Sequence, residues 1–474
     1  LPGDSVLLHC GQTWYESLTI ASSGTAANPI SIGPYPASCS PPPLISGIVS
    51  IPSNAWSLYK NNTYQAPIAF NMVESGSFNT SLSGWSQYSS TGDSTIALLP
   101  CNGLPADLCM AVTSRASNAL VSSNKFPLRA MASYNLSMSV LIPSGVNLQL
   151  MVRRGGPPYE SAGVATTISG TGNWQMLTFP FVATRTIDTA RVDIVFPAGL
   201  QNVLFNDVVL SENFTDVSQV FANGVGLNPA HHPNVGFNPN RPQSVYLNMA
   251  TDGNSVLQSN GTYGSTYIET GSDLVLPPGG ALSKGLSVRV RANPWTIDER
   301  KLMSVAGSRI QLDLPTSSQA KAGFGYFLLG ALWMLDSPGE WFYERATKTL
   351  YVRMPDNAAP GTRISFARRD YGVRIDNLAY INITGLWIQG TDRGISMNRS
   401  SNIVLENSLI EKTLAQGIDA QGATGSTIAN NTISATGRDA IYAWGSLGKG
   451  SNLTISGNTI TQSGVVVANG VPIS

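Results

Sequence analysis

The chain has 474 residues with 28 basic and 28 acidic side chains, and only 12% of its residues are charged, against about 25% in an average soluble protein. This length predicts two or three modules, and the balanced charge argues against a nucleic-acid-binding surface. No apolar run approaches the ~20 residues that a membrane-spanning helix needs.

The first segment, residues 1–69, begins in mid-phrase with LPGDSVLLHCGQTWYESLTIASSG, and no signal peptide is visible. The chain also ends at Ser474 inside a repeat, without a polar cap. A solenoid needs caps because an open end exposes apolar interior and unpaired strand edges. We therefore expect a mature protein or a fragment whose solenoid continues beyond residue 474, or one that self-associates end to end.

The four cysteines form two local pairs in the sequence, Cys10/Cys39 and Cys101/Cys109. The second pair brackets CNGLPADLC, a loop too short and Pro-rich to fold unaided, so a disulfide is predicted there. Pairing of Cys10 with Cys39 is predicted as well, in preference to a zinc site. Disulfides indicate a secreted or cell-surface protein.

The middle segment, residues 70–213, alternates apolar and polar residues with a period of two. This pattern predicts half-buried antiparallel strands. The alternating apolar positions are Tyr134, Leu136, Met138 and Val140, then Leu148, Leu150 and Val152, then Val192, Ile194 and Phe196. We predict a β-sandwich inserted in a surface loop of the flanking fold.

Sugar binding by such a sandwich requires aromatic faces and polar partners for hydroxyl groups. Tyr88 and Tyr159 are the aromatic candidates. Tyr159 stands in the Gly/Pro-rich stretch RRGGPPYES beside Arg153 and Arg154, which predicts an exposed ring with two cations. An ordinary loop tyrosine has the same sequence signature, so both interpretations stay open.

The final segment, residues 214–474, contains a phrase repeated four times. The copies are INITGLWI at 381–388, IVLENSLI at 403–410, TIANNTI at 427–433 and TISGNTI at 454–460. The matching residues Ile383, Leu405, Ile428 and Ile455 are 22, 23 and 27 residues apart, which indicates stacked units that bury apolar faces only against their neighbours. β-Branched residues alternate with polar ones and no helical pattern intervenes, so we predict a right-handed parallel β-helix. Asn residues at one turn predict a ladder of side-chain amides.

The repeat also predicts a polar patch on the β-helix surface. If Ile395, Ile418 and Ile441 point inward, their successors Ser396, Asp419 and Tyr442 form one outward column. A second column contains Arg393, Gln416 and Asp439, with Lys412 and Arg438 on the same rungs.

Asp419, Asp439, Arg438, Lys412 and Tyr442 are therefore the candidate catalytic residues. Two carboxylates suit glycoside hydrolysis, whereas a cation and a Tyr, Lys or Arg base suit elimination from a uronic acid. Charged side chains that merely solvate the solenoid are the alternative.

Four other titratable residues stand in two short phrases and are interpreted as structural. His231 and His232 belong to AHHPN, and Asp336 and Glu340 belong to DSPGEW. No metal-binding His pair on a helix, nucleophile elbow or phosphate loop is present in the sequence.

The opening PGDSV and SGTAANPISI resemble the first rungs of right-handed β-helix proteins of the pectate-lyase-like superfamily. QVFANGVGLNPAHHPN, SVRVRANPWTI and GYFLLGALWMLDSPGEWFYERATKTLYVRMPD resemble one bacterial branch of it. The middle segment, from NMVESGSFNTSLSGW to VLFNDVVLSENF, is similar to jelly-roll carbohydrate-binding modules. That resemblance implies a Ca²⁺ site at Asp207, although Asn79 stands where a calcium-binding Glu is common.

Two classes of function follow from these observations. The first is a secreted polysaccharide-binding and polysaccharide-degrading protein, a lyase or a glycoside hydrolase. The second is a non-catalytic extracellular surface or filament protein, with the β-helix as a rod and the sandwich as a contact module. Fold alone does not separate them.

Overall fold

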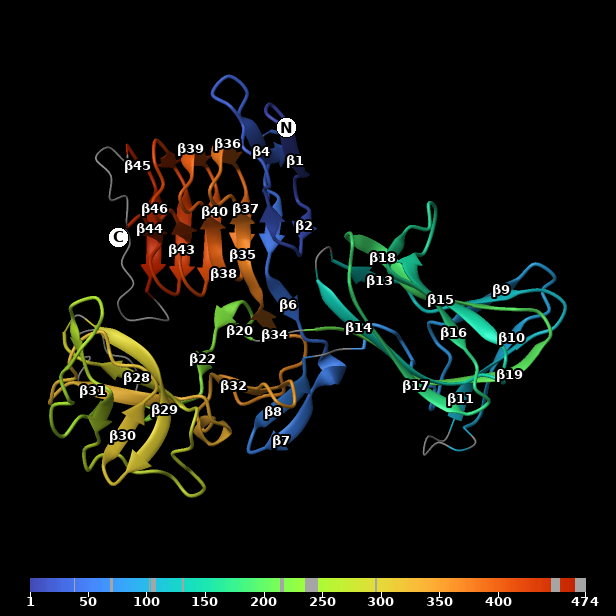
Figure 1. Ribbon diagram of the computed structural model, residues 1–474, viewed down its shortest axis with the longest axis horizontal. Coiled ribbons are helices and arrows are strands. Elements are labelled where there is room, and N and C mark those ends of the chain that lie inside the picture. Colours follow the sequence, from blue (N-terminus) through green and yellow to red (C-terminus); the bar gives the residue numbers. More distant parts are fainter. Residues whose placement is uncertain are drawn as a thin grey trace. The chain divides into compact units, whose positions relative to one another are not determined.

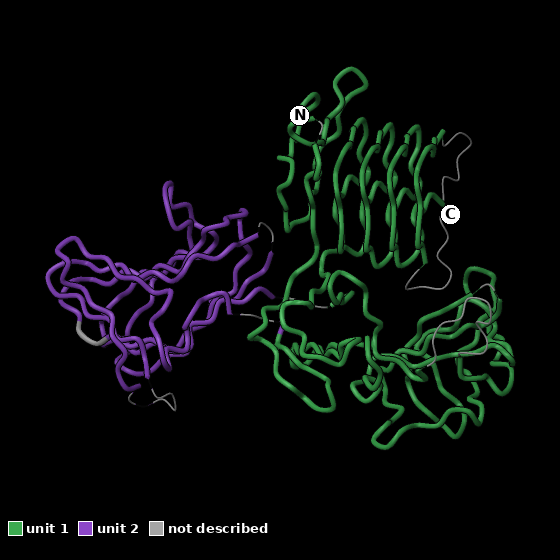
Figure 2. The backbone as a smooth tube through the Cα atoms, turned by 180° about the vertical axis from the view of Figure 1, so that it is seen from behind, with its two compact units in different colours: residues 1–67, 216–474 green, residues 68–215 purple. Residues whose placement is uncertain are grey.

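The computed structural model describes residues 1–37, 39–68, 71–101, 103, 108–129, 132–213, 217–234, 246–294, 296–444 and 452–464. They divide into two compact units, unit 1 (residues 1–67 and 216–474) and unit 2 (residues 68–215), which Figure 2 shows in separate colours. The fold is all-β, with two short 3₁₀ turns, η1 (Ser53–Ala55) and η3 (Leu332–Met334), in the described part of unit 1. No helix in these ranges is long and apolar enough to cross a membrane.

Unit 1 contains the predicted parallel β-helix, which has three sheets (Figure 1). The first sheet contains β1 (Ser5–His9), β4 (Ile30–Tyr35), β36 (Ala379–Thr384), β39 (Ser401–Glu406), β42 (Thr427–Ala429) and β45 (Thr454–Ser456). The second contains β2 (Thr13–Trp14), β5 (Leu44–Ser46), β37 (Trp387–Gln389), β40 (Leu409–Thr413), β43 (Thr432–Thr436) and β46 (Thr459–Ser463). The third contains β3 (Leu18–Thr19), β35 (Arg369–Arg374), β38 (Thr391–Ser396), β41 (Ile418–Asp419) and β44 (Ile441–Tyr442).

The apolar residues of the repeat form the β-helix core as predicted. Ile383, Leu405 and Ile428 occupy successive rungs in parallel register and have no exposed surface. Because each rung covers the next one, burial of these side chains along the stack supplies the main stabilisation.

The predicted amide ladder is present at one turn. Asn431 Nδ2 donates to Leu405 O at 3.1 Å and to Asn458 Oδ1 at 3.0 Å, and Ser408 takes the same place one rung earlier. The preceding residues Asn407 and Asn430 have φ of 54° and 56°, a conformation that Asn tolerates better than most residues.

The N-terminal rungs pair directly with the C-terminal repeat. Ile30 is in register with Ile381, and Ile45 with Ile388, across more than three hundred residues of sequence. The chain therefore leaves the solenoid after its second rung and returns at β35. The described strands between these two points belong to other sheets.

Residues 219–353 lie within the segment that was expected to form β-helix rungs, yet their strands pair mainly in antiparallel fashion. Two further sheets of unit 1 contain some of these strands. One contains β6 (Ile48–Ser50), β20 (Gln219–Ala222), β21 (Val225–Gly226) and β34 (Ile364–Ala367). The other contains β7 (Ser57–Lys60), β8 (Thr63–Pro67), β22 (Asn228–Pro229), β32 (Glu340–Glu344) and β33 (Thr349–Arg353). The antiparallel lobe contains β23 (His231–His232), β24 (Leu247–Asn248), β25 (Val256–Leu257), β26 (Tyr263–Gly264), β27 (Tyr267–Glu269), β28 (Ser287–Arg291), β29 (Ile297–Ala306), β30 (Arg309–Leu312) and β31 (Gly325–Leu329). Short hairpin connections such as the one between β28 and β29 permit only antiparallel neighbours.

Unit 2 is a sandwich of two antiparallel sheets with its own core. One sheet contains β10 (Thr95–Pro100), β11 (Leu108–Ser114), β14 (Ser133–Leu141), β17 (Trp174–Val182) and β19 (Leu200–Glu212). The other contains β9 (Ser86–Ser89), β12 (Ala119–Ser122), β13 (Phe126–Leu128), β15 (Asn147–Arg154), β16 (Ser161–Ser169) and β18 (Ile187–Phe196). Alternate residues of these strands, including Tyr134, Leu150 and Ile194, are completely buried.

Both predicted disulfides are confirmed. Cys10 bonds to Cys39 in unit 1, and Cys101 bonds to Cys109 in unit 2. Disulfides persist in oxidising compartments outside the cytosol.

Candidate functional site

The third β-helix sheet carries the polar column that the repeat predicts. Ser396 is in register with Asp419, and Asp419 with Tyr442, while the preceding isoleucines are buried in the core. The column is less open than expected, because Ser396 has no exposed surface and Asp419 is only 5% exposed. Neighbouring polar side chains cover both of them.

Arg393 connects two carboxylates at this face. Its Nε lies 3.0 Å from Asp419 Oδ2, and its Nη1 lies 3.7 Å from Asp392 Oδ2. Nη1 also donates to the Tyr371 hydroxyl at 3.4 Å, and Asn398 Nδ2 donates to Asp419 Oδ2 at 3.0 Å. We call Tyr371, Asp392, Arg393, Asn398 and Asp419 the Arg393 cluster.

The two carboxylates of the cluster have different surroundings. Burial raises the pKa of Asp392, and the negative charge of Asp370 raises it further, while Arg393 and Arg438 only partly offset this effect. Asp419 instead holds the guanidinium at short range through Oδ2, and its buried Oδ1 has no hydrogen-bond partner. A buried carboxylate oxygen without a partner loses its hydration without compensation, so it marks a place where a ligand group could bind.

The structure separates the remaining candidates. Asp439 is buried, with 5% of its surface exposed, on the rung after Gln416. Arg438 is exposed, and its charge acts on Asp392. Lys412 belongs to β40 of the second sheet, where its Nζ lies 3.5 Å from Glu411, and it makes no contact with Asp419.

Lys412 lines a cleft of about 1110 Å³ within unit 1. The cleft is bounded by β20 to β22, by β28, β29 and β32, and by the β40 and β43 corner of the β-helix. Its charged lining residues are Arg289, Glu299, Lys301, Glu344, Arg345, Glu411 and Lys412. Several are paired within the cleft: Arg289 with Glu299 at 2.9 Å, and Lys412 with Glu411 at 3.5 Å.

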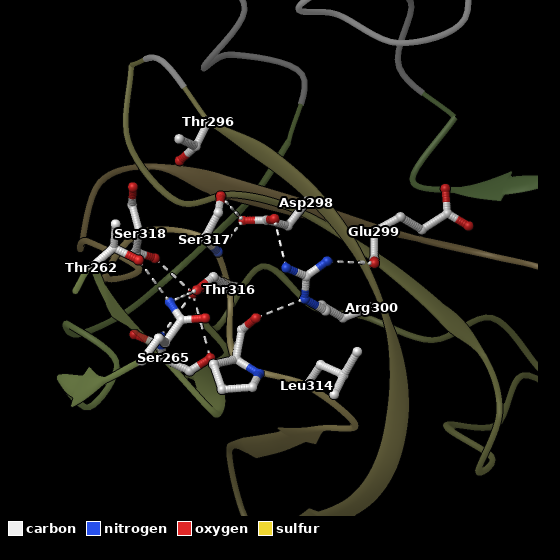
Figure 3. A network of polar contacts seen from close by, with 12 residues as sticks. Thr262, Ser265, Thr296, Asp298, Glu299, Arg300, Leu314, Thr316, Ser317 and Ser318 are labelled. Carbon is white, nitrogen blue, oxygen red and sulfur yellow. Dashed lines mark hydrogen bonds and ion pairs between the residues drawn. The ribbon is translucent and has the colours of Figure 1, made fainter. Parts of the chain in front are cut away.

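A network of polar contacts around Asp298 and Arg300, the residues on either side of Glu299 in the sequence, supports the antiparallel lobe (Figure 3). Asp298 accepts hydrogen bonds from Arg300 at 2.8 Å and from the backbone and hydroxyl of Ser317, both at 2.9 Å. Thr316 Oγ1 in turn donates to Ser318 O at 2.6 Å. Both oxygens of Asp298 are satisfied, so this network fixes the loop after β30 and has a structural role.

The AHHPN and DSPGEW phrases meet in space. His231 Nδ1 lies 2.9 Å from Glu340 Oε1, and Glu340 is only 2% exposed. Burial lowers the pKa of His231, but the hydrogen bond and the negative charge of Glu340 outweigh this, so the pKa lies above its usual value. This pair joins β23 to β32, in keeping with the structural role expected for both phrases.

In unit 2 the candidate sugar-binding residues Tyr88, Arg153 and Arg154 lie on the sheet of β15 and β18, and Tyr159 lies in the loop that joins β15 to β16. Tyr88 on β9 is 66% exposed and Tyr159 is 48% exposed. Arg153 lies over the Tyr159 ring at 5.2 Å, and Arg154 Nη2 donates to Glu160 at 3.2 Å. The carboxylate of Asp193, which the sequence did not single out, anchors Arg153 at 2.6 Å and Arg191 at 2.8 Å.

The calcium candidate Asp207 is an exposed residue with φ of 48° at a bulge in β19. In the ranges that the structure describes, no group of three or more His, Cys, Asp or Glu residues could hold a metal ion. All four cysteines are in disulfides. Asp207 is therefore not part of such a group among the described residues.

Comparison with known proteins gives one family match and several structural likenesses. The family described as "Periplasmic copper-binding protein (NosD)" matches residues 350–471, which contain most of the β-helix repeat. No curated protein matches the sequence. Among the described residues, no group of three or more His, Cys, Asp or Glu residues could hold a copper ion, and all four cysteines are in disulfides.

Among solved structures, one titled "Glycoside hydrolase" has a TM-score of 0.48 at 10% identity and covers 98% of this chain and 67% of its own. A structure titled "CBM4 structure and function" has a TM-score of 0.23 at 20% identity over 27% of this chain and 95% of its own. The N-terminal cellulose-binding domain of Cellulomonas fimi beta-1,4-glucanase C has a TM-score of 0.24 at 19% identity over 30% of this chain and 96% of its own.

Proposed function

We propose that this protein is a secreted polysaccharide-active enzyme that hydrolyses glycosidic bonds at the Arg393 cluster and binds the polymer through unit 2. The observation that carries the proposal is the pair of carboxylates, Asp392 and Asp419, on one guanidinium in unlike surroundings. Glycoside hydrolysis needs such a pair, one carboxyl protonated and the other ionised.

Asp392 is the candidate general acid. Burial raises its pKa, which favours the protonated form, and about a third of its side chain is accessible to a substrate. In the proposed reaction, the Asp392 proton passes to the glycosidic oxygen as the bond from that oxygen to the anomeric carbon breaks.

Asp419 is the candidate base. Arg393 and Asn398 hold Oδ2, which leaves the buried Oδ1 as the oxygen that accepts the proton of an attacking water. Tyr371 and Tyr442 border the two carboxylates and offer hydroxyl groups for substrate orientation.

The proposal is tested by the products formed from a panel of neutral and acidic polysaccharides. A hydrolase releases reducing ends only, whereas a lyase would also create an unsaturated uronide that absorbs in the ultraviolet. Asp392→Asn and Asp419→Asn should each lower turnover by about 10² or more, because each removes a proton donor or acceptor of the reaction.

Asp356→Asn is the matched control, since Asp356 is an exposed carboxylate paired with Arg363 on the same unit. Turnover by this variant should equal that of the unmodified protein. If no polysaccharide is cleaved, or if both active-site variants retain full turnover, the protein is instead a non-catalytic rod with a contact module.

A further inference from the structure

A fully buried carboxylate organises one face of unit 2. Val192 and Ile194 belong to the hydrophobic core, so the residue between them, Asp193, points to the other side of the sheet. Asp193 nevertheless has no exposed surface, because polar side chains enclose it. Oδ1 accepts a hydrogen bond from Ser122 Oγ at 2.6 Å and lies 2.8 Å from Arg191 Nε, and Oδ2 lies 2.6 Å from Arg153 Nε.

The two arginines are held by only one nitrogen each. Arg153 and Arg191 are cross-strand neighbours on β15 and β18, and both use Nε to contact Asp193. Within the described residues, no hydrogen bond or ion pair occupies their terminal nitrogens. Because a guanidinium is planar, fixing Nε also fixes the direction of the Nη1–Nη2 edge. Each arginine therefore presents two oriented N–H₂ groups without further loss of side-chain freedom.

Positive charge exceeds negative charge around this pair. Arg154 and Arg185 share the single carboxylate of Glu160 at 3.2 and 2.5 Å. Lys125 and Arg191 both pack over Gly155, where an added Cβ would lie 3.1 Å from Lys125 Cε and 3.2 Å from Arg191 Cδ. The group contains five cations and two carboxylates: Lys125, Arg153, Arg154, Arg185 and Arg191 with Glu160 and Asp193. The chain as a whole has a net charge of zero, so this excess is local.

Exposed aromatic rings accompany the cations. The Tyr159 ring packs against Arg153 and stands at a turn with φ of 56°, closed by a hydrogen bond of 2.8 Å from its own N–H to Gly156 O. Tyr88 lies on the same sheet, where β9 pairs with β12 and β12 with β18. A pyranose ring can stack on such a face while an acidic substituent pairs with a guanidinium.

We infer that this face of unit 2 binds acidic polysaccharides, with Arg153 and Arg191 pairing with carboxylate or sulfate groups of the sugar. The inference rests on the proposed polysaccharide-binding role of unit 2 and assigns it a substrate class. Neutral glucans or xylans would leave the oriented guanidinium edges without anionic partners.

The test is binding of the full chain, in an Asp419→Asn background, to polygalacturonate and to its fully methyl-esterified form. The methyl ester keeps the same polymer backbone and replaces each negative carboxylate with a neutral ester. Polygalacturonate should bind at least tenfold more tightly, and this preference should shrink between 0.05 and 0.5 M NaCl because salt screens the ion pairs. Dextran sulfate measured against dextran separates sulfate from carboxylate recognition.

Two variants test whether the cations around Asp193 cause the preference for polygalacturonate. Arg153→Gln and Arg191→Gln combined with Asp193→Asn remove both guanidinium groups together with their shared carboxylate, so no buried charge is left unpaired, and the triple variant should lose the preference for the free acid. Lys125→Gln leaves the buried pair intact and should weaken binding about threefold. Arg115→Gln, which removes an exposed cation elsewhere in unit 2, should change nothing.

The outcomes distinguish the inference from the function on which it rests. Equal binding of polygalacturonate and its methyl ester would overturn the acidic-polymer inference while leaving a sugar-binding module. Equal binding of single-stranded DNA would reduce the face to a general polyanion surface and also refute it. If no glycan binds at all, the proposed binding role of unit 2 fails as well, whereas cleavage by unit 1 is measured independently.

Discussion

The buried carboxylates Asp193, Asp298 and Asp419 differ in how completely their oxygens are paired. Asp298 and Asp193 each have both oxygens engaged by cations or hydroxyl groups. Asp419 has one engaged oxygen and one that is buried without a partner. A fully paired carboxylate stabilises the fold, whereas a half-paired one carries a desolvation cost that a substrate could relieve.

The charge of Arg438 should set the pH range of catalysis. This cation lowers the pKa of Asp392, while burial and Asp370 raise it, and the net effect is a raised pKa. A general acid works only while protonated, so turnover should fall as pH rises through this pKa. Arg438→Gln removes the lowering influence and should move this basic limb to higher pH in a pH–rate profile.

Arg399→Gln provides the control, because Arg399 is an exposed cation bonded to Asn377 and away from Asp392. The stability of the protein should change with pH in the same direction as its activity. The raised folded-state pKa of Asp392 contributes stability at low pH that is lost as pH rises from about 3.9 through the raised value. An unchanged basic limb in Arg438→Gln would remove Asp392 from the role of general acid.

At the scale of elements, the sequence predicted the strands of the β-helix repeat and missed the antiparallel strands, whose pairing joins residues distant in the sequence. The step of about 23 residues placed Ser396, Asp419 and Tyr442 in one column, because parallel rungs translate sequence spacing directly into register. The pairing of Arg153 with Arg191 depends on antiparallel register between distant strands, which no local pattern encodes. The antiparallel lobe was missed for the same reason, since short alternating strands resemble rungs until their partners are known.

The contact between β23 and β32 should make unit 1 sensitive to pH through His231. Because Glu340 raises the folded-state pKa of His231, their interaction contributes fully below the unfolded value of about 6.5 and is lost as pH rises through the folded value. The melting temperature of unit 1 should therefore decline over this window. Glu340→Gln should be less stable below pH 6.5 and should flatten the decline.

His232→Gln is the matched control on the neighbouring residue. Burial lowers the pKa of His232, so its contribution has the opposite sign and stability rises as this imidazole loses its proton. Removal of His232 should leave in place the decline in melting temperature that His231 causes as pH rises. A decline that persists undiminished in Glu340→Gln would show that another group causes it.

At the scale of the whole molecule, the two units have separate hydrophobic cores and one disulfide each. The core of unit 2 draws its residues from Val73 to Leu210, and the β-helix core draws its residues from the N-terminal rungs and the C-terminal repeat. Separate cores predict separate unfolding transitions, so one free energy of unfolding does not describe this chain.

Each disulfide should therefore stabilise only its own unit. Loop-closure entropy predicts a loss of about 3.6 kcal/mol for removal of Cys10–Cys39 and about 2.5 kcal/mol for Cys101–Cys109. The larger value belongs to the longer sequence separation, 29 residues against 8. Calorimetry of the two Cys→Ser double variants should show one lowered transition in each, with the other unchanged. If either variant lowers both transitions together, the units unfold as one cooperative body, and the unit 2 face and the Arg393 cluster are coupled in stability.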